Sequence, residues 1–310
     1  MVNTAFVFPG QGSQTVGMLA DLIPKYSIIT ALFSQASEIV GYDLLQLVLQ
    51  GPEEKLNQTE HTQVAMLTAD VAVFELLMQQ AVPMPQWMAG HSLGEYAALV
   101  AANAMSFTDA VVLVRSRAQV MQQAVPMGQG AMAAIVGLSD DEVSVLCKQA
   151  SLKSELVSPA NFNAIGQVVV AGHTQAVERL IQLAFDANAR LARIIPVSVP
   201  CHCPLLREAA EVFADSLEKT PLRSPSVSVV SNVDLSIYQS AEHIRNNLQA
   251  QLYSPVRWVE TIQLFKNKGI DFIIECGPGK VLNGLVKRID KSLSIISVYD
   301  TISLNGVVTS

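Results

Sequence analysis

Apolar residues along the chain alternate between short continuous runs and longer stretches of helical spacing. The run 5–8 is short enough for a buried strand, and a second run covers 86–89. Helical spacing follows each run, over 29–41 and 62–80 after the first and over 93–102 after the second. Alternating strands and helices predict an α/β fold with a mainly parallel sheet covered by helices on both faces.

The pattern changes between about 130 and 198. Here it predicts strand, helix, strand, strand, helix and strand, over 131–138, 140–150, 156–160, 167–171, 175–187 and 191–197. The first of these helices opens with a capping box from Ser139 to Glu142, and Thr174 is an acceptable N-cap for the second. The βαββαβ order is that of a ferredoxin-like module.

This module interrupts the rest of the chain. We expect residues 129–198 to form an inserted ferredoxin-like subdomain, and residues 1–128 with 199–310 to form one discontinuous large α/β domain. A cleft between the two units would be the natural place for a ligand.

Composition excludes several classes of protein. Half of the 310 residues are hydrophobic and 15% are charged, which excludes a disordered chain. The net charge of −7 argues against a nucleic-acid partner. Residues 1–102 carry 2 Lys or Arg against 9 Asp or Glu, while residues 253–310 carry 7 against 5, so a docking site for an acidic partner is expected late in the chain.

Cysteine use and hydropathy predict a cytoplasmic protein without a membrane anchor. Four cysteines in a chain of this length do not make a disulfide framework, and the first residues lack the basic start of a signal peptide. Two uncharged stretches, 118–139 and 156–177, are broken by Gln, Asn, Pro and Gly, so neither is expected to span a membrane. The pair Cys201 and Cys203 has no second pair of ligands nearby, so we expect no metal site.

The segment Gly90-His-Ser-Leu-Gly94 fits the G-x-S-x-G pattern between a strand and a helix. Flanking glycines permit a sharp turn that exposes the hydroxyl of Ser92 as a nucleophile. The same turn directs the N–H of Leu93 toward an oxyanion at the start of the following helix. The alternative is an ordinary turn in which Ser92 is the helix N-cap.

A serine nucleophile needs a base, and the chain has five histidines, which are His61, His91, His173, His202 and His243. His202 lies where the chain leaves the inserted module, at the boundary between the two units, and it is our candidate. His91 adjoins the serine on a tight turn and therefore points elsewhere. A core histidine with a backbone partner remains the alternative for His202.

The glycine-rich start, Gly10-Gln-Gly12-Ser-Gln-Thr-Val-Gly17, offers a second oxyanion donor. Its third glycine comes too late for a dinucleotide fingerprint, and no Lys-Ser/Thr follows for a P-loop. Glycine does allow the backbone to approach a ligand closely, which would aim the N–H of Gln11 into the cleft. A simple tight turn is the alternative.

Several motifs together resemble the malonyl-CoA:acyl carrier protein transacylase family. They are Pro9-Gly-Gln-Gly-Ser-Gln14, Thr62-Gln63, Gly90-His-Ser-Leu-Gly-Glu-Tyr96, Arg115-Ser-Arg117, Asn161-Phe-Asn163 with Gly166-Gln167, Val199-Pro-Cys-His-Cys203, Gln251-Leu-Tyr-Ser-Pro255 and Glu275-Cys-Gly-Pro-Gly-Lys280. They fall in order over nearly the whole chain. The family has a hydrolase-like large domain with a ferredoxin-like insertion, in agreement with the pattern above.

The resemblance implies catalytic roles at matching positions. Ser92 would be acylated while His202 takes and returns its proton, and the backbone carbonyl of Gln251 would orient the imidazole in place of a carboxylate. The N–H groups of Gln11 and Leu93 would form the oxyanion hole.

The resemblance also implies substrate-binding residues. Arg117 would pair with the free malonyl carboxylate, and Gln63, Asn163 and His91 would line the acyl and CoA cleft. Residues 115 and 117 lie about 200° apart on a helix, so only one of them can face the cleft. A guanidinium gives a carboxylate a permanently charged, bidentate partner.

The implied reaction is a ping-pong transfer of malonyl from malonyl-CoA, through a serine ester, to the phosphopantetheine thiol of acyl carrier protein. Such transfers need no metal or redox cofactor, and we expect a monomer. Lys280, Lys287 and Arg288 are the candidate contacts for the acidic carrier protein. The alternatives are an esterase or thioesterase using the same serine, a transacylase for another acyl group, and a non-catalytic module that binds carrier protein.

Overall fold

The computed structural model describes residues 3–126, 128–197 and 199–308. In chain order the elements are β1 (Thr4–Phe8), α1 (Ser27–Val40), α2 (Leu44–Gln50), α3 (Glu53–Leu56), α4 (Thr59–Gln79), β2 (Trp87–Gly90), α5 (Gly94–Ala101), α6 (Phe107–Ala124), β3 (Gly130–Val136), α7 (Asp140–Ala150), β4 (Val157–Ala164), β5 (Gln167–His173), α8 (Thr174–Asp186), β6 (Leu191–Ile195), the 3-10 turn η1 (Pro204–Leu206), α9 (Arg207–Lys219), β7 (Ser228–Val230), α10 (Ala241–Gln251), α11 (Trp258–Asn267), β8 (Phe272–Cys276), α12 (Val281–Ile289), β9 (Ser294–Val298) and α13 (Thr301–Val308).

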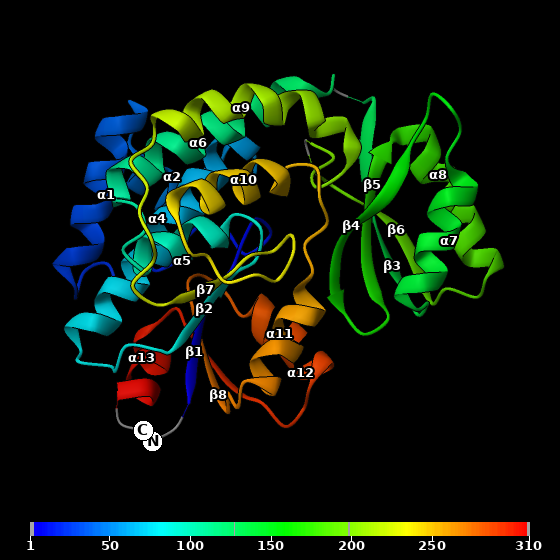
Figure 1. Cartoon of the computed structure of the whole chain (residues 1–310). Helices are drawn as coiled ribbons and strands as arrows, with labels where there is room; N and C mark the ends of the chain where they lie inside the picture. Colours follow the sequence, from blue (N-terminus) through cyan, green and yellow to red (C-terminus); the bar gives the residue numbers. More distant parts are fainter. Residues whose placement is uncertain (1–2, 127, 198, 309–310) are drawn as a thin grey trace.

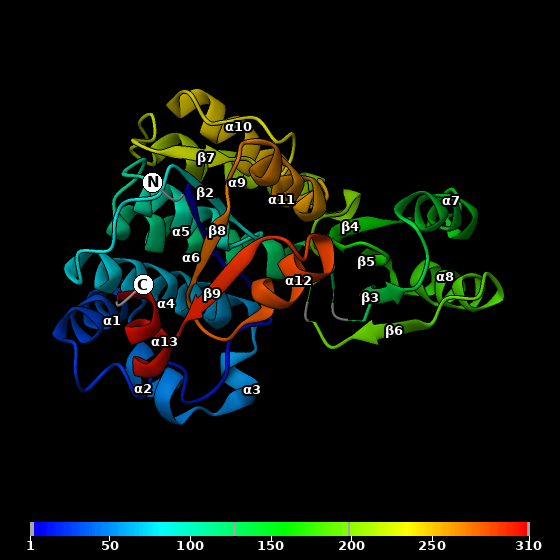
Figure 2. The same ribbon diagram turned by 90° about the horizontal axis from the view of Figure 1, so that it is seen from below.

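The large unit is built on a parallel sheet with strand order β7-β2-β1-β8-β9. Side chains alternate across the central strand, so that Phe6 and Phe8 pack into one core and Ala5 and Val7 into another. Helices α4, α5 and α6 contribute to the first core, while α11 and α12 contribute to the second. Helices therefore cover both faces, as Figures 1 and 2 show, and the predicted fold class is confirmed.

The smaller unit is an antiparallel sheet with strand order β4-β5-β3-β6. Helices α7 and α8 pack on one face of it, through a core of small and branched apolar side chains. Its opposite face includes Met132 and Ala171 and packs against Cys203, at the return to the large unit. The unit lies to one side of the large sheet (Figure 1).

Strand β4 joins the two units directly. The N–H of Phe162 donates to the carbonyl of Val256 at 2.9 Å, and the N–H of Val256 donates to the carbonyl of Ala160 at 2.9 Å. Strand β4 extends to Ala164, beyond the predicted end at 160. Its pairing with β5 carries two register shifts, one between Pro159 and Asn161 and one between Phe162 and Ala164. These irregularities explain why its polar residues did not give a strand pattern.

Two local predictions on the inserted unit have opposite outcomes. The capping box is confirmed, because Ser139 accepts from the N–H of Glu142 and the Glu142 carboxylate accepts from the N–H of Ser139. The N-cap prediction for Thr174 is wrong, because His173 is the N-cap of α8. The hydroxyl of Thr174 instead donates to the carbonyl of Gly128 at 2.8 Å, which joins α8 to the loop between α6 and β3. Residue 198, where the inserted unit was predicted to end, lies outside the described residues.

No helix among the described residues is long and apolar enough to cross a membrane. The described residues also contain no group of three or more His, Cys, Asp or Glu side chains that could hold a metal ion.

Candidate active site

Ser92 occupies a sharp turn between β2 and α5, at the carboxyl end of the sheet. Its φ of 54° lies in the left-handed region, which costs energy for a residue with a Cβ. Gly90 and Gly94 make the turn possible: a Cβ on Gly90 would lie 1.8 Å from the carbonyl carbon of Gly94, and one on Gly94 would lie 2.0 Å from the carbonyl oxygen of Phe8. The turn is therefore built to hold a serine in a strained position.

The alternative that Ser92 serves as a helix N-cap is wrong. The N-cap of α5 is Leu93, and no side chain caps this helix end. The Ser92 hydroxyl instead points to His202, with 2.7 Å between Oγ and Nε2. It is thus available for chemistry and not used to stabilise the helix.

His202 is held with one ring nitrogen toward the serine and the other toward the backbone. Its Nδ1 lies 2.7 Å from the carbonyl oxygen of Gln251, so Nδ1–H donates and Nε2 is left to accept from the Ser92 hydroxyl. The side chain is almost fully buried, and burial together with the charge of Arg117 lowers the pKa of His202 to about 3. The imidazole is therefore neutral at physiological pH, as a general base must be.

The other four histidines do not approach the serine hydroxyl. His61 is the third residue of α4 and packs edge-on against Tyr42. His173 ends β5, and His243 lies in α10 beside Ser236. His91 turns away from the serine toward Asn163.

Two backbone N–H groups lie close to the nucleophile. Within the described residues, the N–H groups of Gln11 and Leu93 have no hydrogen-bond acceptor. The loop that carries Gln11 lies directly on the turn, because a Cβ on Gly10 would come within 2.4 Å of the carbonyl oxygen of His91 and 3.7 Å of the Leu93 nitrogen. Unpaired donors at this place can receive a developing oxyanion.

Asn232 fixes the backbone of the turn from the far side. Its Oδ1 accepts from the N–H of Ser92 at 2.7 Å, and its Nδ2 donates to the carbonyl of Gly90 at 2.7 Å. The N–H of Ser92 is consequently engaged, which leaves the next N–H in the chain, that of Leu93, for a ligand. Asn232 was not among the residues predicted for the site from the sequence.

Arg117 is fully buried in α6 and lies beside the nucleophile. Its Nη1 donates to Oε1 of Gln63 at 2.7 Å, its Nη2 donates to Oε1 of Gln251 at 3.0 Å, and Nη2 lies 3.4 Å from Oγ of Ser92. Within the described residues, no carboxylate is within ion-pair distance of this guanidinium. A buried cation without a carboxylate partner is costly unless an anion occupies the site.

Arg115, two residues earlier, is exposed and donates to the carbonyl of Ile39. Only one of the two arginines faces the site, as the helical spacing predicted.

The remaining predicted residues surround this centre. Gln63 connects Arg117 to the glycine-rich loop, because its Nε2 donates to Oε1 of Gln11 at 3.2 Å. Asn163 of β4 reaches in from the inserted unit, and Nε2 of His91 donates to its Oδ1 at 2.8 Å. The His91 ring packs edge-on against Trp258, and burial lowers its pKa, so it is neutral. The structure thus brings together all nine residues predicted for the site, which are Gln11, Gln63, His91, Ser92, Leu93, Arg117, Asn163, His202 and Gln251.

Glu95 is a buried carboxyl group of the site that sequence reasoning did not assign. It lies in the first turn of α5 and accepts from Tyr238 Oη at 2.7 Å, from the N–H of Asn232 at 3.1 Å and from Nε2 of Gln251. Its place directly after Gly94 in the G-x-S-x-G segment was the only local signal for it.

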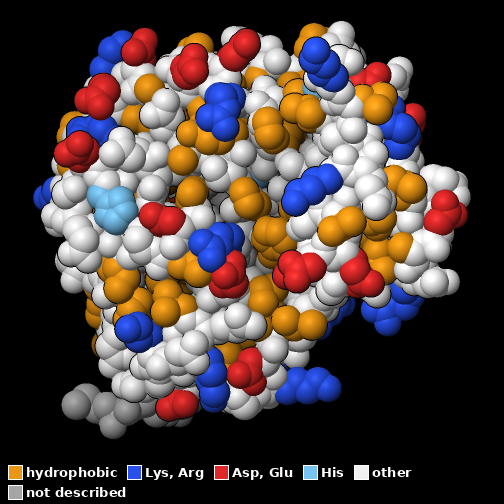
Figure 3. Space-filling model, turned by 45° about the vertical axis from the view of Figure 1, so that its right-hand side comes forward, with side chains coloured by type: hydrophobic (Ala, Val, Ile, Leu, Met, Phe, Trp, Pro, Cys, Tyr) orange, Lys and Arg blue, Asp and Glu red, His pale blue; other side chains and the backbone are white. Residues whose placement is uncertain are grey.

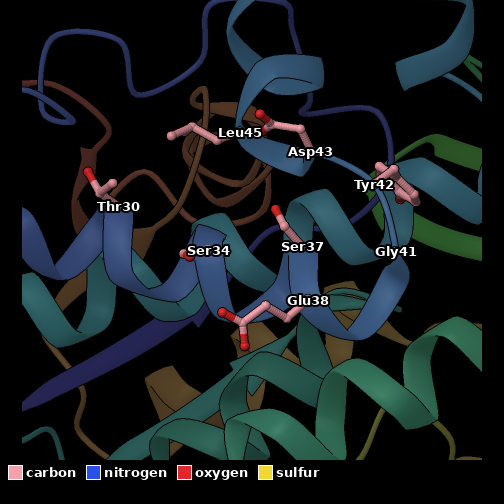
Figure 4. Close-up of a pocket in the computed structure, with 8 residues that line it drawn as sticks. All are labelled: Thr30, Ser34, Ser37, Glu38, Gly41, Tyr42, Asp43 and Leu45. Carbon is pink, nitrogen blue, oxygen red and sulfur yellow. The ribbon is translucent and has the colours of Figure 1, made fainter.

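A separate hollow of about 500 Å³ lies between α1 and the start of α2. Figure 4 shows the side chains that line it, among them Glu38, Tyr42 and Asp43. None of the site residues lines this hollow, so it is not part of the site.

Comparisons with known proteins agree with this geometry. The family model of the acyl transferase domain matches residues 5–304. The malonyl CoA-acyl carrier protein transacylase of Haemophilus influenzae is 51% identical over 308 residues, covering 99% of this chain and 98% of the relative. The enzyme of the same name from Escherichia coli strain K12 is 50% identical over 294 residues, with 95% of each chain covered.

Solved structures give the same result. The malonyl CoA-acyl carrier protein transacylase of Coxiella burnetii superposes with a TM-score of 0.98 at 48% identity, covering 99% of this chain and 97% of the other. A malonyl-transacylase solved in complex with a type II polyketide synthase acyl carrier protein has a TM-score of 0.97 at 47% identity, with 99% of both chains covered.

Proposed function

The chain belongs to the acyl transferase domain family, and from that membership and the site we propose that it transfers malonyl groups from malonyl-CoA to acyl carrier protein. The product is the malonyl donor for fatty acid elongation. The acyl group passes through an ester on Ser92, in two half-reactions that share one site.

In the first half-reaction Ser92 Oγ attacks the thioester carbonyl while Nε2 of His202 takes the hydroxyl proton. The carbonyl of Gln251 stabilises the imidazolium that forms, because Nδ1–H already donates to it. The N–H groups of Gln11 and Leu93 receive the oxyanion. The C–S bond then breaks, the imidazolium returns its proton to the leaving thiolate, and CoA leaves.

In the second half-reaction the phosphopantetheine thiol of the carrier protein gives its proton to His202 and attacks the ester. The C–O bond breaks and the proton returns to Ser92 Oγ. Both steps exchange one acyl bond for another, so the proposed reaction needs no metal or redox cofactor.

The single observation that carries the choice of malonyl is the buried guanidinium of Arg117. It lies 3.4 Å from the nucleophile and has no carboxylate partner within the described residues. A malonyl ester on Ser92 ends in a free carboxylate that would supply the missing charge. A neutral acyl group would leave it unpaired.

The carrier protein docks, in this proposal, on the face that carries Lys280, Lys287 and Arg288. All three side chains are exposed, the last two in the final turn of α12. On the face shown in Figure 3, Lys and Arg side chains, together with Asp and Glu, lie among hydrophobic ones around a hollow. The chain is proposed to work as a monomer, because one copy holds every residue of the site.

The test is to incubate the protein with malonyl-CoA alone and to determine its intact mass. We expect one added malonyl group, absent from Ser92→Ala and far less abundant when acetyl-CoA replaces malonyl-CoA. Release of free malonate without an adduct would make the protein a hydrolase. Absence of both adduct and malonate would refute malonyl as the substrate.

A further inference from the structure

We propose that Glu95 is a positioning residue for malonyl transfer, whose ionised carboxylate fixes the side-chain amide of Gln251 and thereby holds Arg117 ready for the substrate. The fall of the transfer rate at low pH is then set by protonation of Glu95 and not by protonation of His202. This inference rests on the proposed function.

Gln251 connects the parts of the site. Its backbone carbonyl accepts from His202, while its side-chain Oε1 accepts from Nη2 of Arg117 at 3.0 Å. Its Nε2 donates both to the carbonyl of Ser92 at 3.0 Å and to the carboxylate of Glu95. One fully buried glutamine therefore contacts the base, the nucleophile, the guanidinium and a carboxylate.

These contacts require one orientation of the amide. If the Gln251 amide were flipped, its NH₂ group would face the donor groups of the Arg117 guanidinium. Its oxygen would face two acceptors, the carbonyl of Ser92 and the carboxylate of Glu95. An ionised carboxylate has only acceptors and favours the orientation observed. A protonated Glu95 presents an O–H group, which weakens this preference and with it the hold on Arg117.

The groups that face Glu95 come from several elements. Its charged and titratable neighbours are Arg117 of α6, Tyr96 of α5 and Tyr238, which lies between β7 and α10. Burial raises the pKa of Glu95 to about 7, against the hydrogen bonds from Tyr238, Gln251 and Asn232 and the charge of Arg117.

The charge state of Glu95 therefore changes within the physiological range. The pKa of His202 is about 3 and that of His91 is also lowered, so both rings are neutral there.

The test is the pH dependence of kcat/KM for malonyl-CoA between pH 5 and 9, with acetyl-CoA as the comparison substrate. For the unmodified enzyme we expect kcat/KM for malonyl-CoA to fall as the pH drops below about 7, by up to about tenfold per pH unit, because only the ionised fraction of Glu95 holds Arg117 ready for the malonyl carboxylate. Acetyl transfer, which makes no carboxylate contact with Arg117, should depend less on pH in this range.

Two variants separate positioning from a merely structural role. Tyr238→Phe removes a hydrogen bond that stabilises the ionised carboxylate, so the midpoint of the acid limb should move to higher pH. Glu95→Gln should abolish this limb, with KM for malonyl-CoA raised more than KM for acetyl-CoA. Thermal unfolding of both variants checks that they fold, and if Glu95→Gln does not fold, Tyr238→Phe alone decides.

An unmoved midpoint in Tyr238→Phe would overturn the proposal, as would equal effects of Glu95→Gln on the two substrates. Failure of the proposed function is a distinct result, since the unmodified enzyme would then form no malonyl-serine at any pH.

Discussion

Replacing Arg117 by Ala tests the substrate assignment most directly. The guanidinium is fully buried, and Gln63 and Gln251 already hold it in place, so the substrate carboxylate meets a preorganised partner. Each hydrogen bond to a charged group contributes about 1.5–3 kcal/mol, and a bidentate contact therefore contributes about 3–6 kcal/mol. At about 1.4 kcal/mol per factor of ten, the loss is on the order of 10²- to 10⁴-fold.

The substitution also leaves a cavity and two unpaired amides, which slow transfer of every acyl group. The informative quantity is therefore the ratio of malonyl to acetyl transfer, measured with both CoA esters in the same tube and read from the mass of the acylated enzyme. Effects common to all acyl groups cancel in this ratio, so we expect it to fall on the order of 10²- to 10⁴-fold, with relative activity gained toward acetyl-CoA. Arg115→Ala, exposed on the same helix, is the matched control and should leave the ratio within about twofold. A ratio in Arg117→Ala equal to that of the control would refute the assignment of Arg117 to the malonyl carboxylate.

Three further predictions follow from other parts of the molecule. Burial raises the pKa of Asp70 well above its ordinary value of 3.8, so above about pH 4 the carboxyl ionises in the unfolded chain but not in the folded one, and the folded state loses stability. Asp70→Asn removes this loss. Its free energy of unfolding should exceed that of the unmodified protein by about 1.4 kcal/mol more for each pH unit, until the pKa of the folded state is reached. Urea unfolding of both proteins at pH 5 and pH 8 measures the difference in free energy of unfolding, and an equal difference at the two pH values would contradict the prediction. Replacing Lys287 and Arg288 by Glu should raise KM for the carrier protein several-fold and leave KM for malonyl-CoA unchanged. The increase in KM for the carrier protein should become smaller at high salt. An unchanged KM for the carrier protein would exclude these two residues from the docking surface. Burial raises the pKa of the Cys201 thiol to about 11, so little reactive thiolate is present at pH 7. Iodoacetamide should therefore inactivate the enzyme slowly at pH 7 and faster as the pH rises. Rapid inactivation at pH 7 would contradict this, because it would show that the thiol is already ionised there.

The nucleophilic turn could be predicted from sequence because its requirements are local. A strand that leads into a serine between two glycines already specifies the turn, and the structure shows why no Cβ fits at Gly90 or Gly94. His202 could be chosen among five histidines because the chain re-enters the large unit there.

The polar groups that support the site could not be predicted in the same way. Asn232 lies 140 residues from the serine whose N–H it accepts, and nothing in its own segment indicates that contact. Glu95 resembles an ordinary acidic residue in the first turn of a helix, and only burial shows that its charge is enclosed. The side chain of Gln251 was missed for a related reason, since the resemblance assigned a role only to its backbone carbonyl. Hydrogen bonds between distant segments are set by the tertiary fold, which residue spacing does not report.

The position of β1 in the middle of the sheet determines when the enzyme can fold during synthesis. The first strand to leave the ribosome pairs with β8 along one edge, with Thr4 opposite Phe272. At about 5–20 residues per second, that edge waits on the order of ten to sixty seconds for its partner. Over this interval its N–H and C=O groups are open to strands of other nascent chains, and the apolar face of Ala5 and Val7 has no cover from α11 and α12. We therefore expect ribosome-bound chains that stop before residue 272 to aggregate more readily than the finished chain, and chaperones that shield strand edges to raise the yield of folded enzyme without changing its activity.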